Sequence, residues 1–145
     1  MIVADANLLV VLVSGDPRGN RVLQYFTDWL DNNIEIHAPS LAQYEIANAL
    51  TRLIVGGAFQ KDKVEEAWNN ISILPIQYHN LTNAGRVVEI ALALNRKNAY
   101  DAAYIALAET LGAELWTLDS PLYLNAKGLG FPVNLISSAR ISSSI

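Results

Sequence analysis

Short apolar runs and segments with helical spacing alternate along the chain. Between the runs, apolar side chains recur every three or four residues, as in 22–30 and 87–94, which is typical of helices packed on a core. Strands that alternate with helices predict a parallel sheet covered by helices on both faces. We therefore expect an α/β fold, a three-layer sandwich with a central parallel sheet of about five strands. The expected strands are runs rich in β-branched side chains: 2–4, 34–38, 73–76, 114–118 and 133–136.

Capping residues mark several helix ends. Ser40 and Gln43 form a capping-box pattern at the start of an apolar segment, which the glycine pair beginning at Gly56 should stop. Ser120, followed by proline, has the order of an N-cap and a first helical residue. Residues 98–112 are alanine-rich and end in glycine, so they predict the clearest helix of the chain.

One domain accounts for the whole pattern. A chain of 145 residues is long enough to bury a full core, and we expect this domain to span residues 1–136. The serine-rich residues 137–145 are expected to form a loosely held C-terminal tail. Hydrophobic residues make up 52% of the chain and charged residues only 17%, so some apolar surface is expected to contact another subunit.

The composition excludes several kinds of protein. No cysteine is present, which rules out disulfides and thiolate metal sites. The apolar stretch 8–13 is too short to span a bilayer, and Asp5 with no basic residue before it does not fit a signal peptide. We expect a cytoplasmic protein that does not associate with membranes.

The net charge of −4 argues at first against a nucleic-acid partner, because proteins that bind phosphates are usually basic. The chain has 14 acidic and 10 basic residues. If four acids surround bound cations, 14 − 4 = 10 acids remain, which equals the number of bases. The bulk charge therefore neither supports nor excludes RNA binding.

Four acidic residues occupy positions where the ends of parallel strands meet. Asp5 and Asp119 each follow a predicted strand, and Glu45 lies about one turn into the helix that follows another. Ligand sites of open parallel sheets form at this edge. Asp101 lies in the first turn of its helix, but connectivity does not fix its place, because that helix follows another helix.

Each acid also has a purely structural interpretation. Asp5 and Asp119 could be N-caps, and Asp101 could offset the positive end of a helix dipole. Glu45 is the only acid between 41 and 55, and burying a carboxylate is costly unless it is paired or bound to metal. Its partner on the same helical face could be Arg52 or Asn48.

The available ligands favour a hard cation. Carboxylate oxygens suit Mg²⁺ or Mn²⁺ better than Zn²⁺, and the two histidines, His37 and His79, are most simply ordinary residues of strands or loops. The sequence has no glycine-rich phosphate loop and no nucleophile-elbow motif. Nucleophilic serine or cysteine catalysis is therefore disfavoured.

With these residues identified, the sequence resembles the PIN domain, and specifically the VapC toxins. The resemblance spans about 1–135 and rests on four motifs in the family's order: VADANLLV, APSLAQYEIANAL, AYDAAYIALAE and LWTLDSPL. It implies a ribonuclease that hydrolyses RNA with water activated by Mg²⁺ or Mn²⁺. It also implies a homodimer and inhibition by a VapB-type antitoxin.

The resemblance assigns roles residue by residue. Asp5, Glu45 and Asp101 would be the catalytic metal ligands, with Asp119 as the more variable fourth acid. Asn7 and Thr117 match accessory polar positions that orient water or a ligand.

Basic residues near these motifs are candidates for RNA contacts: Arg18, Arg21, Arg96 and Lys97. They could equally be solvated surface or compensate a helix dipole. One departure from the family is Ser120-Pro121, where relatives often carry basic residues. The contact with the RNA backbone on that side is therefore expected to differ from that of relatives.

Other functions remain as alternatives. A phosphatase of the haloacid-dehalogenase type needs a second aspartate where this chain has Asn7, which cannot donate a carboxylic proton. A phosphoacceptor receiver domain lacks its lysine in the expected last strand. A non-catalytic module with the PIN fold, or a solitary RNA-processing nuclease without an antitoxin, is the main alternative.

Overall fold

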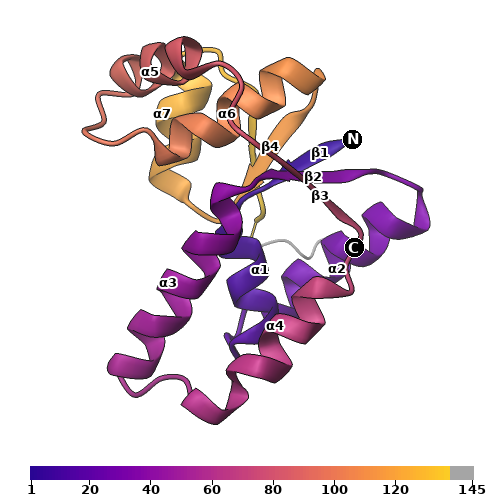
Figure 1. Ribbon diagram of the computed structural model, residues 1–145. Coiled ribbons are helices and arrows are strands. Elements are labelled where there is room, and N and C mark those ends of the chain that lie inside the picture. The colour runs from indigo at the N-terminus through magenta and orange to yellow at the C-terminus, as the bar shows by residue number, and fades with distance from the viewer. Residues whose placement is uncertain (138–145) are drawn as a thin grey trace.

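A five-stranded parallel sheet forms the centre of the computed structural model, which describes residues 1–137 (Figure 1). The strands lie in the order β3-β2-β1-β4-β5, and each neighbouring pair is parallel. The central strand β1 is bordered by β2 and β4. The bounds of the strands are β1 Ile2–Ala4, β2 Ile36–Pro39, β3 Ile76–His79, β4 Glu114–Thr117 and β5 Val133–Leu135.

Seven α-helices of the described chain cover this sheet in two layers. Helices α1 to α4 lie on one side of the sheet and α5 to α7 on the other (Figure 1), so the expected α/β three-layer sandwich is confirmed. None of the helices within 1–137 is long and apolar enough to cross a membrane. The bounds of the helices are α1 Ala6–Val13, α2 Gly19–Asp31, α3 Leu41–Val55, α4 Val64–Ser72, α5 Ala84–Ala93, α6 Tyr100–Leu111 and α7 Ser120–Gly128, with a short 3₁₀ turn at Lys61–Lys63.

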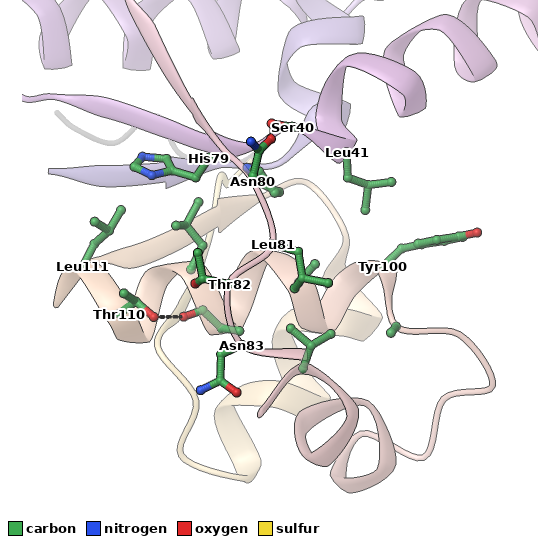
Figure 2. A pocket seen from close by; sticks show the side chains of 16 residues that line it. Ser40, Leu41, His79, Asn80, Leu81, Thr82, Asn83, Tyr100, Thr110 and Leu111 are labelled. Carbon is green, nitrogen blue, oxygen red and sulfur yellow. Dashed lines mark hydrogen bonds between the residues drawn. The ribbon is translucent and has the colours of Figure 1, made fainter. Parts of the chain in front are cut away.

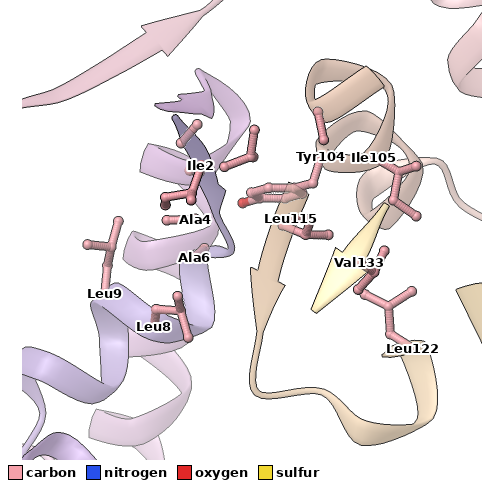
Figure 3. Packing of buried hydrophobic residues seen from close by; sticks show 14 of the residues in the cluster. Ile2, Ala4, Ala6, Leu8, Leu9, Tyr104, Ile105, Leu115, Leu122 and Val133 are labelled. Atoms are coloured by element: carbon pink, nitrogen blue, oxygen red, sulfur yellow. The ribbon is translucent and has the colours of Figure 1, made fainter. Parts of the chain in front are cut away.

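The core is built around β1, because this strand is buried along its whole length. Side chains from α1, α6, β4, β5 and α7 surround it (Figure 3). Helix α1 is the continuous apolar stretch LLVVLV, and its contacts with α2, α3 and α4 leave no wide polar face. This explains why the stretch does not show a simple helical alternation of apolar and polar residues.

The predicted third strand is wrong in position. Residues 73–76 were expected to be extended, but Ile73 closes α4, where its N–H donates to the carbonyl oxygens of Asn69 and Ile71. Ile73 is 79% exposed. The strand begins only after Pro75 and runs to His79 at the edge of the sheet. Its partly exposed polar residues did not stand out as an apolar run.

The other strands are confirmed with small shifts. The second begins at Ile36 instead of residue 34, because the N–H of Ile34 bonds to the carbonyl of Trp29 and completes the end of α2. The fourth and fifth strands each end one residue earlier than expected, at Thr117 and Leu135. Of the expected tail 137–145, residues 138–145 lie outside the described part of the chain.

Two predicted helix caps are wrong. Ser40 makes no capping hydrogen bond; its hydroxyl donates to Oδ1 of Asn80 on the neighbouring connection, 2.9 Å away. Helix α7 is capped by Asp119, not Ser120, because the Asp119 carboxylate accepts from the N–H of Leu122. Ser120 is already the first helical residue. The glycine stops at Gly56 and Gly112 are confirmed.

The connectivity creates a switch point between β1 and β4. The chain leaves β1 through helices on one face of the sheet and forms β2 and β3 on one side of it. It then crosses to the other face and adds β4 and β5 on the opposite side. Ligands of open α/β sheets bind at such a reversal, beyond the carboxyl ends of the strands.

Candidate active site

Asp5 sits at this switch point, directly after the central strand. It is the N-cap of α1, and its Oδ1 accepts from the backbone N–H of Asn7 at 3.3 Å. Its Oδ2 accepts from the hydroxyl of Thr117, at the end of β4, at 2.8 Å. The structural interpretation of Asp5 as a cap is thus correct. Its position between β1 and α1 places the carboxylate at the end of the sheet.

Thr117 and Asn7 link the ends of β1 and β4. The fully buried Thr117 hydroxyl also accepts from Nδ2 of Asn7 and from the backbone N–H of Asp119, at 3.2 and 3.0 Å. The side-chain oxygen of Asn7 in turn faces the N–H of Leu118 at 3.4 Å. Both accessory residues named from the sequence therefore lie in one network that orients Asp5.

Glu45 has a partner that the sequence did not reveal. The hydroxyl of Tyr104 on α6 donates to Oε1 of Glu45 on α3, with 2.5 Å between the oxygens. Neither Arg52 nor Asn48 makes this bond. The charge of Arg52 lowers the pKa of Glu45, but this is the smallest of the effects on that carboxyl. The signal was the spacing of Tyr104 three residues after Asp101, which places both side chains on one face of an alanine-rich helix.

Asp101 and Asp119 complete the acidic group. Asp101 lies in the first turn of α6, as expected, and the positive charge of Arg96 acts on it from the preceding connection. Asp119 caps α7 with Oδ1. The charge of Asp119 raises the pKa of Asp101, so the two carboxylates are electrostatic neighbours.

Three of the four acids, Asp5, Glu45 and Asp101, have raised pKa values. Burial is the largest cause that raises the pKa of Asp5, to about 7, and the charges of Asp101 and Glu45 add to the rise. Burial also raises the pKa values of Glu45 and Asp101, and the charge of Asp101 raises that of Glu45 further. Hydrogen bonds from Thr117 and Asn7 oppose the effect at Asp5. Crowding of the carboxylates thus adds to the effect of burial at Asp5 and Glu45.

The donor set fits a hard, hydrated cation. Within residues 1–137 no three acidic or histidine side chains already lie close enough together to bind one metal ion. Mg²⁺, however, usually keeps several waters and is held through one or two carboxylates. Buried carboxylates with neighbouring negative charges favour a divalent cation, because its positive charge offsets both the loss of water and the repulsion between them.

The histidines do not belong to this group. Nδ1 of His37 and Nε2 of His79 lie 2.8 Å apart, and Nε2 of His37 lies 3.0 Å from Oε1 of Glu35. They connect neighbouring positions of β2 and β3, which confirms their interpretation as ordinary strand residues.

The basic candidates divide into two kinds. Arg18 is held by two hydrogen bonds to the carboxylate of Asp16, and Arg21 donates to the carbonyl of Ser137 at 2.9 Å. The positive charge of Arg96, in contrast, lowers the pKa of Asp101. Among the four candidates, Arg96 is thus placed beside the acidic group.

A largely apolar cavity of about 470 Å³ borders the site. It lies between the start of α3, the connection from β3 to α5, and α6 (Figure 2). Leu41, Leu81 and Tyr100 surround one end of it, and Leu111 lies at the other. The cavity thus lies beside α3 and α6, the helices that carry Glu45 and Asp101, although none of the four acids lines it.

Comparison with known proteins gives a consistent result. The PIN domain family model matches residues 2–127. Ribonuclease VapC3 of Pyrobaculum aerophilum is 31% identical over 128 residues, which cover 83% of this chain and 91% of that protein. Ribonuclease VapC9 of Mycobacterium tuberculosis is 30% identical over 122 residues, 82% of this chain and 86% of that protein.

A solved structure shares the fold. A chain of a toxin-antitoxin complex from Klebsiella pneumoniae superposes with a TM-score of 0.67 at 18% identity, covering 96% of this chain and 100% of that chain. The family model and the two relatives show the family, and this structural similarity supports the fold. The chain belongs to the PIN-domain family and, within it, to the VapC proteins.

Proposed function

We propose that the protein is a metal-dependent endoribonuclease, the toxin of a VapBC-type pair, whose site is formed by Asp5, Glu45, Asp101 and Asp119. The observation that carries this proposal is the grouping of buried or half-buried carboxylates at the carboxyl edge of the sheet, where Asp5 follows β1 and the charges of Glu45 and Asp101 act on it. The names of the relatives, ribonuclease VapC3 and ribonuclease VapC9, support the activity.

The carboxylates would hold Mg²⁺ or Mn²⁺, and the bound ion would make water a better nucleophile and neutralise charge on the phosphodiester. Thr117 and Asn7 keep Asp5 fixed through hydrogen bonds to both of its oxygens. Because these bonds use only part of the acceptor capacity of each oxygen, Asp5 retains lone pairs for a ligand. Asp119 keeps one oxygen outside its cap bond to Leu122.

The proposed RNA contact begins at Arg96. Its charge lies beside Asp101, so a phosphate held there would meet both a cation site and a guanidinium. Lys97 follows it in the chain and could extend the contact. Arg18 and Arg21 are less available for such a contact, since their side chains already have partners.

The test is cleavage of RNA with Mg²⁺ or Mn²⁺, with and without EDTA, by the full chain and by Asp101→Asn. We expect EDTA to abolish cleavage and the substitution to lower its rate by about 100-fold or more, since even partners of metal ligands are worth about 10- to 100-fold. Asp62→Asn, which removes an exposed acid outside the site, is the matched control.

Four outcomes would contradict the proposal in whole or in part. Cleavage that persists in EDTA, or that Asp101→Asn leaves unchanged, would remove these carboxylates from the mechanism. Absence of cleavage on every RNA tested would instead favour a non-catalytic interaction module. Cleavage in a host that lacks any antitoxin gene beside this one would favour the solitary processing nuclease.

We also propose a VapB-type antitoxin as partner, supported by the similarity to a chain of a toxin-antitoxin complex. An arginine of such a partner could bind two of the carboxylates and displace the metal. Co-expression of the neighbouring gene, followed by purification of a complex that no longer cuts RNA, tests this.

Homodimer formation and a cytoplasmic location complete the proposal. The cavity beside the site is the surface best suited to a second subunit, because exposed Leu81 and Tyr100 extend its apolar lining. The location follows from the action on RNA. Fractionation of the cells that produce the protein checks it.

A further inference from the structure

Tyr104 reaches the acidic group from the interior of the protein. It lies one turn after Asp101 on α6 and is only 1% exposed. Its ring extends from α6 toward β1 among buried apolar side chains (Figure 3). A buried phenol must hydrogen bond to offset the loss of water, and a phenylalanine would fill the same space without that need. The buried hydroxyl of Tyr104 therefore needs hydrogen-bond partners inside the protein.

The contacts of that hydroxyl are all with the candidate site. It donates to Oε1 of Glu45 at 2.5 Å. A backbone hydrogen bond from Ala6, the residue after Asp5, also acts on the phenol oxygen, as does the charge of Asp5. One side chain of α6 thus connects the start of α1 to Glu45 on α3.

Glu45 needs such a restraint. It is half-buried, and neighbouring Asp101 repels its charge. A glutamate side chain has three rotatable bonds and loses up to about 2 kcal/mol of rotamer entropy when it is fixed. Without a donor on the inner side, repulsion and entropy would both favour turning the carboxylate out toward water.

We propose that Tyr104 is a positioning residue that restrains the Glu45 carboxylate on the side of Asp101, so that Glu45 is oriented to hold a hydrated divalent cation. This inference rests on the function proposed above, because it assigns Tyr104 a task only if Glu45 binds metal. Hydrogen-bonding partners of metal ligands raise affinity by fixing ligand orientation.

The test is the affinity of the full-length protein for Mn²⁺, measured by isothermal titration calorimetry, in the Tyr104→Phe variant. Phenylalanine keeps the ring and removes only the hydroxyl. We expect the Kd for Mn²⁺ to rise by about 10-fold or more, with a cooperative thermal transition retained. Tyr78→Phe removes the same group from a half-buried tyrosine on β3 and should leave the Kd unchanged.

A double-mutant cycle with Glu45→Gln separates positioning from general structure. If Tyr104 acts through Glu45, adding Tyr104→Phe to Glu45→Gln should not weaken Mn²⁺ binding further. A role in packing alone would lower the thermal midpoint equally in both backgrounds and leave the Kd alone. Should Tyr104→Phe fail to fold, Tyr104→Met, which also lacks the hydroxyl, must show the same loss of affinity.

The outcomes distinguish this inference from the proposed function. If Glu45→Gln binds Mn²⁺ as tightly as the unaltered protein, the proposed metal site itself is wrong. If Glu45→Gln weakens binding but the tyrosine variants do not, the metal site stands and the role of Tyr104 is overturned.

Discussion

Asp5 shows that a structural and a functional role can share one side chain. As an N-cap it accepts a hydrogen bond from the first turn of α1, and as the residue directly after β1 it lies where the charges of Glu45 and Asp101 act on it. The two interpretations of this residue from the sequence appeared to compete. They do not, because a cap uses only part of the acceptor capacity of a carboxylate.

The raised pKa of Asp5 predicts how the metal-free protein responds to pH. The folded protein holds this proton up to about pH 7, whereas the unfolded chain releases it near the ordinary value of 3.8. The stabilising contribution is therefore complete below about pH 4 and is lost as the pH rises to about 7. In EDTA, we expect a lower urea midpoint at about pH 8 than at about pH 5.5.

Asp5→Asn should flatten this dependence, because an amide does not titrate. Asp62→Asn, on the exposed 3₁₀ turn, should keep it. A midpoint for the unaltered protein that rises between the two pH values would contradict the burial of an ionisable Asp5. Added Mn²⁺ should reduce the difference, since a bound cation favours the ionised carboxylates.

At the scale of elements, α6 is the helix on which the site depends. It carries both Asp101 and Tyr104, and it ends at Gly112 with a positive φ of 64°. A Cβ at Gly112 would meet nothing within 4 Å, so any cost of a side chain there comes from the backbone alone. A substitution at Gly112 therefore measures the cost of the backbone conformation at the end of α6 without adding a steric clash.

We expect Gly112→Ala to lower the free energy of unfolding by about 1–2 kcal/mol, because alanine is disfavoured in the left-handed region. Gly128→Ala is the matched control. It also has open space around the added Cβ, but its φ is not positive and it lies within α7. Urea denaturation should show Gly128→Ala to be neutral or stabilising by up to about 1 kcal/mol. Equal destabilisation by both would contradict the backbone explanation.

The elements also show where prediction from sequence works. Buried strands such as β1 and β4 appear as apolar runs, and α6 appears as an alanine-rich segment with a glycine stop. The edge strand β3 was misplaced, because its side chains are half exposed and its neighbour Ile73 belongs to the end of α4. Edge strands carry less of the burial pattern on which such a prediction depends.

At the scale of the whole molecule, the cavity beside the site predicts how a second subunit would bind. Leu81 is 66% exposed and lines this cavity, whereas Ile73 is 79% exposed at the end of α4, outside its lining. If the cavity face forms the dimer, Leu81→Ser should shift the protein toward monomer, because it removes apolar surface from the interface.

Sedimentation equilibrium measures this shift directly. Ile73→Ser removes an apolar side chain that is at least as exposed and should leave the dimer intact. A dimer unaffected by Leu81→Ser, or weakened equally by Ile73→Ser, would place the interface elsewhere. A monomer in the unaltered protein would overturn the proposed homodimer.

The sequence by itself determined the class of the fold, and it singled out the four acids proposed here as the site. Periodicity and caps are local, and the acids follow strands or begin helices whatever the rest of the chain does. The positions of Asp5 and Asp119 at one sheet edge followed from connectivity alone.

Only the tertiary structure decided how these acids meet. It brought α6 across the sheet so that Asp101 lies near Asp5, and it gave Glu45 the Tyr104 hydroxyl in place of Arg52 or Asn48. The hydrogen bonds of Tyr104 to Glu45 and of Thr117 to Asp5 join residues 59 and 112 positions apart in the chain. A local pattern cannot encode such a distance, because the partner is chosen by packing and by the need of a buried polar group for a hydrogen bond.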